Sequence, residues 1–142
     1  MVNLLNKRAK EEIVEAIRWA ERETSGEIRV HLKKKCGEDV LVEAKKVFSR
    51  LRMHRTRERN AVLIFVAWES RQFAILGDRG IHERVGDLFW AETRDTMEAC
   101  FARGLLKEGI TAGVESVGKK LRAYFPRQAK DINELSNTVT EE

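Results

Sequence analysis

The strongest constraint on the fold of this chain is a run of seven apolar residues, 61–67, bounded by polar segments. The run is too short for a typical helix, and its continuous apolar character is typical of a central strand covered on both faces. Only four residues separate it from a second apolar stretch at 72–76, and such a short connection favours an antiparallel hairpin. The sequence therefore predicts a sheet with residues 61–67 at its centre.

Periodic patterns place the other elements around this sheet. Apolar residues at helical spacing predict helices over 7–23, 40–51, 85–101 and 106–125. Alternation of polar and apolar residues over 27–32 predicts a further strand. The order α-β-α-β-β-α-α predicts an α/β fold, a three-layer α/β/α sandwich with a small mixed sheet and helices on both faces. We expect residues 1–126 to form this single domain and residues 127–142 to form a polar tail that is frayed or loosely docked.

Composition narrows the class of protein. The 142 residues are 42% hydrophobic and 35% charged with a net charge of only +4, which excludes a largely disordered chain. Two cysteines make neither a disulfide framework nor a zinc pattern. No apolar run approaches the roughly 18 residues that span a bilayer, and the first residues lack the apolar stretch of a signal peptide. We therefore expect a soluble, cytoplasmic monomer with no membrane span.

Positive charge is concentrated in one part of the chain. From Arg29 to Arg59 there are 11 Lys and Arg against 4 Asp and Glu, so the remainder holds 16 against 19. Five of these arginines lie within residues 50–59. Such a patch can attract phosphates, nucleic acid or anionic lipid, but a charge run most often forms a solvated, partly paired face. We favour the solvated face and keep anion binding by residues 50–59 as an alternative, with nucleic acid as the less favoured ligand.

The expected topology brings polar loop residues together. If the first two strands are parallel and the third runs back, segments 24–27, 55–60 and 77–80 meet at one end of the sheet. The candidate cleft residues there are Arg55 and Arg59 for anion binding, with Thr56, Asn60 and His82 beside them. A general-acid role for His82 is one hypothesis, and an ordinary surface histidine is the commoner outcome.

Three carboxylates are candidate metal ligands. Asp78 lies in a glycine-rich loop, where the backbone can approach Ca²⁺ or Mg²⁺ closely, although an ordinary turn explains the same pattern. Glu27 could supply a second ligand, and pairing with an arginine is the commoner role for such a strand residue. Asp87 is the third candidate, and its position at the start of a helical stretch is more typical of an N-cap.

Several of these segments together resemble the TPM domain family. The segments that carry the resemblance are TSGEIRV at 24–30, RT and RNAVLI within 55–64, GDRGI at 77–81, FW at 89–90, F-x-x-G at 101–104 and GI and GV within 109–114. The resemblance covers roughly residues 8–126. The family includes bacterial proteins of unknown role and a plant thylakoid-lumen acid phosphatase linked to photosystem II repair. It implies an α/β/α sandwich, divalent-metal binding and, in some members, phosphatase activity.

The chain departs from the family pattern at two positions. His82 stands where many members have an acidic residue, and Leu105 stands where many have an acidic or amide residue. Asp87 matches the pattern, and Asp78 matches a subset of bacterial members. Because Ca²⁺ takes about six to eight oxygen ligands, two lost oxygens should leave binding of Ca²⁺ or Mg²⁺ weak or absent.

Two functional hypotheses follow. The first is a binding or accessory module whose polar cleft receives an unknown protein or a small phosphorylated ligand. The second is a metal-assisted phosphomonoesterase, in which Asp78 and Asp87 hold the ion and Arg55 or Arg59 neutralises the phosphate.

Overall fold

The structure is a computed structural model that describes residues 5–127, 137 and 139–142, with the side chain of Asp87 outside that description. The elements are, in chain order, α1 (Lys7–Glu21), β1 (Glu27–Lys33), α2 (Val40–Arg50), η1 (Met53–Arg55), β2 (Ala61–Ala67), β3 (Gln72–Gly77), α3 (Arg79–Val85), η2 (Asp87–Trp90), α4 (Ala91–Ala102), α5 (Leu106–Tyr124) and β4 (Val139–Glu141). The η elements are short 3-10 helices.

The sheet is mixed and has the strand order β3-β2-β1-β4. Strands β1 and β2 are parallel, with Glu27 opposite Ala61, and β2 and β3 form an antiparallel hairpin. The predicted parallel connection through α2 and the predicted hairpin are therefore both confirmed. The central strand is β2, and all seven of its residues are buried.

The fourth strand corrects the sequence prediction. Residues 139–141 form β4, which pairs with β1 in parallel register, so this segment of the expected tail is docked on the sheet rather than frayed. A three-residue strand carries too little periodicity to recognise, and its partner lies more than 100 residues away in the chain. The rest of the expected tail, residues 128–136 and 138, lies outside the described residues. The domain boundary at residue 126 stays a prediction.

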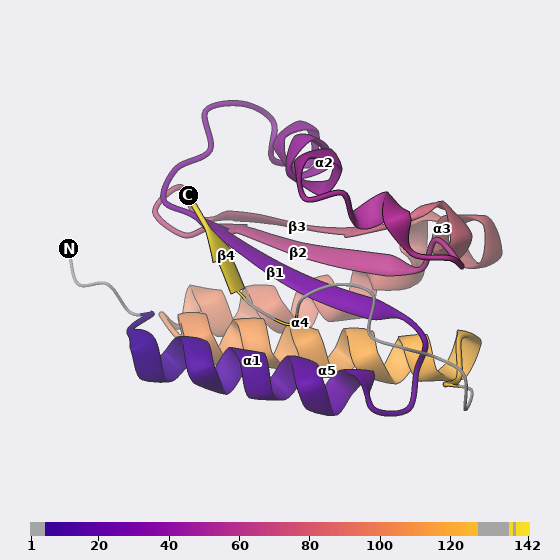
Figure 1. Cartoon of the computed structure of the whole chain (residues 1–142). Coiled ribbons are helices and arrows are strands. Elements are labelled where there is room, and N and C mark those ends of the chain that lie inside the picture. The colour runs from indigo at the N-terminus through magenta and orange to yellow at the C-terminus, as the bar shows by residue number, and fades with distance from the viewer. Residues whose placement is uncertain (1–4, 128–136, 138) are drawn as a thin grey trace.

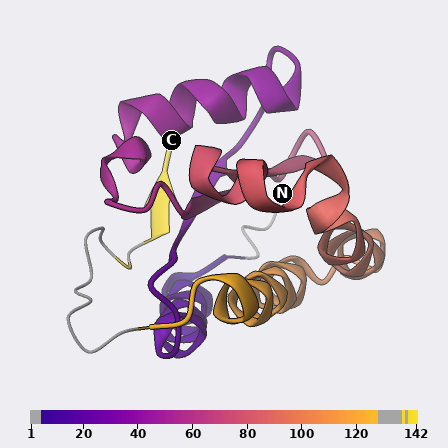
Figure 2. The ribbon, with the colours of Figure 1, turned by 90° about the vertical axis from the view of Figure 1, so that its right-hand side faces the viewer.

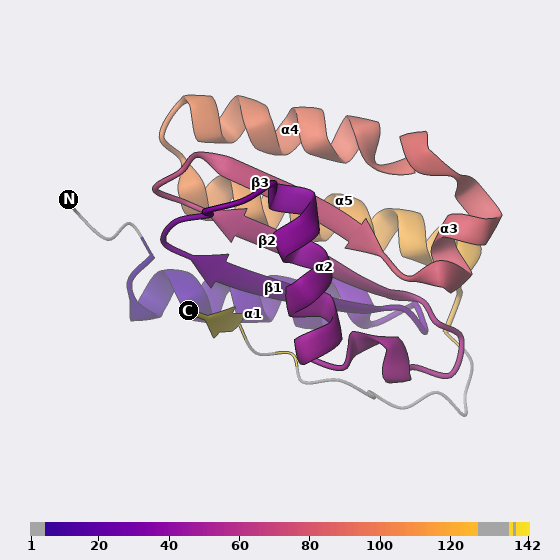
Figure 3. The same cartoon turned by 90° about the horizontal axis from the view of Figure 1, so that it is seen from above.

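Helices cover both faces of the sheet, as predicted. Helices α1, α4 and α5 lie on one face and α2 lies on the other (Figure 1). Seen from above, α2 crosses in front of the sheet, while α1 and α5 lie behind the strands and α4 lies beside β3 (Figure 3). The larger apolar cluster lies between the sheet and the three-helix layer, and the smaller one lies under α2. The predicted α/β/α sandwich is thus confirmed.

Close packing of α1 on α5 depends on a glycine. A Cβ atom built on Gly118 would lie 2.5 Å from the Cβ and 3.0 Å from the Cα of Ala20. The glycine therefore lets the two helices approach at a distance that a larger residue would prevent. Helix α1 begins where Asn6 caps it, since the Asn6 side chain accepts a hydrogen bond from the Ala9 N–H.

The segment after β3 differs from the prediction. The second half of the expected turn at 77–80 is instead the start of helix α3, whose N-cap is Asp78. The expected helix over 85–101 is divided, because Gly86 has a φ of 77° and separates α3 from η2 and α4. Gly86, rather than Asp87, is the N-cap of η2. As a result α3 lies at one end of the sheet, where it faces the viewer in Figure 2.

Candidate functional site

Three loop segments meet at one end of the sheet, as the sequence predicted. The Ser25 hydroxyl lies 2.5 Å from a carboxylate oxygen of Glu58. The Asn60 side-chain amide donates to the Ser25 hydroxyl at 3.1 Å and to the same Glu58 oxygen at 3.3 Å. We call the hydrogen-bonded group of Ser25, Glu58, Arg59, Asn60, Asp78 and Gly80 the sheet-end junction. It joins the approach to β1, the approach to β2 and the start of α3.

The centre of the junction is an ion pair between Arg59 and Asp78. The Arg59 guanidinium donates from Nε to Oδ2 at 2.8 Å and from Nη2 to Oδ1 at 3.0 Å. Oδ1 of Asp78 also accepts the backbone N–H of Arg79 at 2.7 Å, which caps α3. The hydrogen bond to Asp78 raises the pKa of Arg59. Asp78 is buried, and both of its carboxylate oxygens accept hydrogen bonds within the protein.

Steric fit holds α3 against the loop before β2. The Gly80 N–H donates to the Arg59 carbonyl at 2.8 Å. A Cβ atom on Gly80 would lie 2.1 Å from the carbonyl oxygen of Glu58 and 2.6 Å from that of Arg59. Both atoms belong to the backbone and cannot rotate away, so only glycine fits here. The glycine that suggested a metal-binding loop therefore permits a close backbone contact.

The remaining predicted cleft residues have different environments. Thr56 is buried, and its hydroxyl accepts the Asn60 N–H at 3.2 Å, so it stabilises the loop. Arg55 at the end of η1 and His82 on α3 are both exposed. The arginine run is dispersed as well: Arg50 pairs with Glu142 at another part of the sheet, while Arg59 pairs with Asp78.

Glu27 lies in a separate buried group at the start of β1. It is 3% exposed, and its charged neighbours are Glu21 and Arg29. The Glu21 carboxylate accepts the Ile28 N–H at 2.7 Å, and burial is the main cause that raises the pKa of Glu21 to about 8. Burial lowers the pKa of Arg29, against the opposing effect of Glu27 and Glu21. Sequence reasoning missed Glu21, because it continues the polar side of a helix and nothing local marks it as buried.

The described residues, in this arrangement, do not provide a complete metal site. Within the part of the chain that the structure describes, no group of three or more His, Cys, Asp or Glu could hold an ion. Both oxygens of Asp78 are used by Arg59 and the Arg79 N–H, and Glu27 belongs to a different group. The side chain of Asp87 lies outside the described residues. Metal binding by Asp78, Asp87 and Glu27 therefore stays a prediction.

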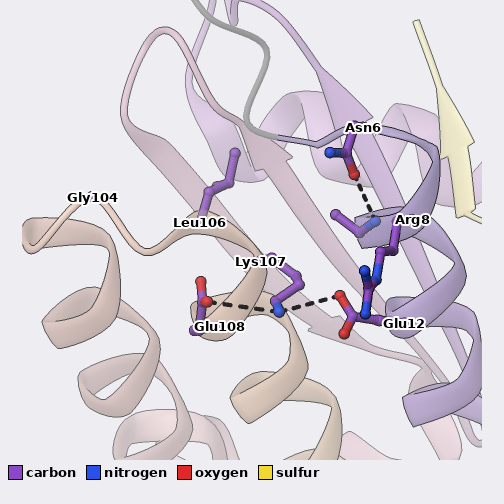
Figure 4. Close-up of a pocket in the computed structure, with 8 residues that line it drawn as sticks. Asn6, Arg8, Glu12, Gly104, Leu106, Lys107 and Glu108 are labelled. Carbon is purple, nitrogen blue, oxygen red and sulfur yellow. Dashed lines mark hydrogen bonds and ion pairs between the residues drawn. The ribbon is translucent and has the colours of Figure 1, made fainter.

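A surface pocket of about 280 Å³ lies away from all the predicted residues, between the start of α1 and the start of α5. It is lined by Asn6, Arg8, Ala9, Glu12, Gly104, Leu106, Lys107 and Glu108. Lys107 extends between Glu12 and Glu108, at 3.2 and 3.7 Å (Figure 4). The hydrogen bond to Glu12 is the main cause that raises the pKa of Lys107. Its charge is therefore compensated within the pocket.

Comparison with known proteins identifies the family. The sequence profile of the TPM domain matches residues 1–120. The chain belongs to the TPM domain family. This TPM domain has no match among curated proteins. No helix in the described part of the TPM domain is both long and apolar enough to cross a bilayer.

Two solved structures share the fold. The first is the NMR structure of BA42 protein from the psychrophilic bacterium Bizionia argentinensis, which is 44% identical, with a TM-score of 0.93 over 100% of this chain and 98% of that chain. The second is the solution NMR structure of the N-terminal domain of cg2496 protein from Corynebacterium glutamicum, with a TM-score of 0.68 over 92% of this chain and 82% of that chain. At 15% identity, the second shows similarity of fold alone.

Proposed function

We propose that this TPM domain is a binding module that receives a small phosphorylated ligand at the arginine-rich end of its sheet. The observation that carries the proposal is the use of Asp78, whose carboxylate pairs with Arg59 and caps α3. A carboxylate in that role fixes α3 against the loop before β2, and three of its roughly four acceptor positions are already used within the protein.

The charge around the junction supports an anionic ligand. Both acids of the junction are hydrogen-bonded within the protein, Asp78 to Arg59 and Glu58 to Ser25 and Asn60. Arginine side chains are exposed on either side of it: Arg52 and Arg55 before β2, and Arg79 on α3, which pairs with Glu83 at 3.6 Å. A guanidinium matches the geometry of a phosphate group, so exposed arginines beside a rigid wall favour phosphate over a neutral ligand.

The test of binding is an amide NMR titration with inorganic phosphate. We expect shifts confined to residues 55–59 and 79–82. Arg55→Ala should weaken binding about fivefold, since one exposed charge pair contributes about 1 kcal/mol. Arg103→Ala, at an exposed arginine after α4, is the matched control and should leave the affinity unchanged. Shifts spread over the whole surface, or equal loss in both variants, would contradict the proposal.

The rival hypothesis, metal-assisted phosphatase activity, is tested with an aryl phosphate in the presence and absence of Ca²⁺, Mg²⁺ and Mn²⁺. If the domain is a binding module, we expect no hydrolysis of the aryl phosphate above background. Turnover that Asp78→Asn abolishes and Glu83→Gln preserves would instead support the phosphatase, because Glu83 is an exposed acid on the same helix. Tight binding of duplex DNA that falls steeply between 50 and 200 mM salt would indicate nucleic acid as the ligand.

A further inference from the structure

A second group of polar residues lies at the opposite edge of the sheet from β3, where residues 139–142 run beside β1 (Figures 1 and 3). The pairing is parallel, with Val139 opposite Val30 and Glu141 opposite Leu32, and the Glu142 N–H donates to the Leu32 carbonyl at 2.9 Å. This segment therefore makes the backbone hydrogen bonds that an added strand makes on the exposed edge of a sheet.

Side chains on one face of the pair bind the tail to α1. Val139 packs against the larger apolar cluster, which α1 helps to form. Glu141 pairs with Lys10 of α1 at 2.8 Å, and these two side chains are 49% and 30% exposed. This face thus accepts an apolar residue followed, two positions later, by an acidic one.

Side chains on the other face bind the tail to β1 and α2. Nδ1 of His31 lies 2.7 Å from the Thr140 hydroxyl, and Nε2 lies 2.7 Å from a carboxylate oxygen of Glu142. Arg50 of α2 donates to the same Glu142 oxygen at 2.5 Å. This face therefore binds a hydroxyl group at one position and a carboxylate two positions later.

The residues around His31 bury its ring and fix its orientation toward the tail. Its side chain is 3% exposed, and its ring stacks on Phe65 at 5.9 Å between centroids. Burial is the main cause that lowers the pKa of His31. In a neutral ring Nε2–H donates to the Glu142 carboxylate, which can only accept, and Nδ1 accepts from the Thr140 hydroxyl. Both ring nitrogens are thus directed at the tail.

We propose that the edge of β1 is a binding site for an extended acidic segment of a partner protein, and that residues 139–142 occupy it in cis. The segment it recognises has an apolar residue, then Thr or Ser, then two acidic residues. The recognition mode is addition of a strand, with backbone bonds supplying affinity and His31, Lys10 and Arg50 supplying specificity. This site is separate from the sheet-end junction and stands independently of the phosphate proposal.

The cis segment is held by contacts that a partner can replace. The ion pairs that hold Glu141 and Glu142 are partly exposed, and such pairs are weak individually. A tethered segment competes at an effective concentration near millimolar, so a partner binds when it makes more contacts than the tail.

The test uses the full chain carrying Glu141→Gln and Glu142→Gln, which weakens the cis segment without removing it. A fluorescein-labelled hexapeptide with the sequence of residues 137–142 is titrated and followed by fluorescence anisotropy. We expect the double variant to bind it at least about tenfold more tightly than the wild-type chain. Adding Lys10→Ala should weaken that binding about twofold, since the exposed pair with Glu141 contributes about 0.5 kcal/mol. A peptide with both glutamates replaced by glutamine is the matched control and should bind several-fold more weakly.

Failure of the double variant to bind the peptide, or equal binding of the control peptide, would overturn the proposal. Native-state hydrogen exchange on the wild-type chain gives a second test that needs no variant. The Glu142 N–H should exchange through local opening, whereas exchange only through global unfolding would mean that the tail cannot be displaced. A wild-type dimer that the peptide dissociates would assign the edge to the tail of a second copy rather than to a separate partner.

Discussion

The sheet-end junction and the β1–β4 edge are both polar clusters on one small sheet, yet they are held together differently. At the junction, Asp78 is buried, and Gly80 touches backbone atoms that cannot move aside. At the edge, the ion pairs of Glu141 with Lys10 and of Glu142 with Arg50 keep substantial contact with water, and the buried His31 also binds Glu142. Buried, sterically fixed contacts give a rigid wall, while exposed pairs give contacts that can exchange. We therefore expect large energetic effects at the sheet end and small ones at the edge.

The largest effect is expected from Glu21, beside the sheet end. Burial raises its pKa from 4.5 to about 8, so the folded state holds this proton more tightly than the unfolded chain does. The contribution to stability is therefore complete below about pH 4.5 and is lost as the pH rises toward 8. The loss is on the order of 4 to 5 kcal/mol, because one pKa unit corresponds to about 1.4 kcal/mol.

Glu21→Gln removes this titration and keeps an oxygen that can accept the Ile28 N–H. Urea unfolding at pH 5, 7 and 9 should show the variant gaining stability relative to wild type as the pH rises. Glu11→Gln, at an exposed position of the same helix, is the control and should follow the wild-type curve. If the free energy of unfolding of Glu21→Gln and of wild type changed in parallel with pH, burial would not raise the pKa of Glu21 as the structure indicates.

Gly80→Ala should have the next largest effect. The added methyl group would collide with the carbonyl oxygens of Glu58 and Arg59, so α3 must move away from the loop and weaken the Arg59–Asp78 pair. We expect a loss of about 3 kcal/mol in the free energy of unfolding, at the upper end for overpacking. Gly37→Ala is the control, because Gly37 is exposed with no atom within 4 Å of an added Cβ. It should change stability by less than about 0.5 kcal/mol. Equal stability of the two variants would mean that the junction is adaptable rather than rigid.

The sequence predicted the architecture because long, strong patterns encode it. The apolar run of β2 and the short link to β3 determined the centre of the sheet, and both were confirmed. The meeting of the three loop segments followed from topology alone. What could not be predicted was the pairing within that meeting point, because a Gly-Asp-x-Gly sequence is equally compatible with an ion site and with a helix cap. The carbonyl oxygens that decide between them belong to residues 58 and 59, about twenty positions away.

The edge was missed for a different physical reason. His31 alternates with apolar residues on β1, and nothing near it in sequence indicates that its ring meets Thr140 and Glu142. The three-residue β4 gains its order from partners in β1, α1 and α2 rather than from its own propensity. A short strand of this kind can be recognised only when the positions of the residues that bind it are known.

The smallest expected effect distinguishes the edge from the sheet end most directly. Lys10→Ala removes the ion pair with Glu141, whose side chain is half exposed, and should cost about 0.5 kcal/mol. The loss should appear in the local opening of the Glu142 N–H, measured by hydrogen exchange, and leave the global free energy of unfolding nearly unchanged. Arg18→Ala breaks a similar exposed pair with Glu15 on the same helix and should leave the Glu142 N–H unaffected. If Lys10→Ala lowered local and global stability by the same amount, the tail would open only when the whole domain unfolds. The contrast between a rigid sheet end and an exchangeable edge would then be wrong.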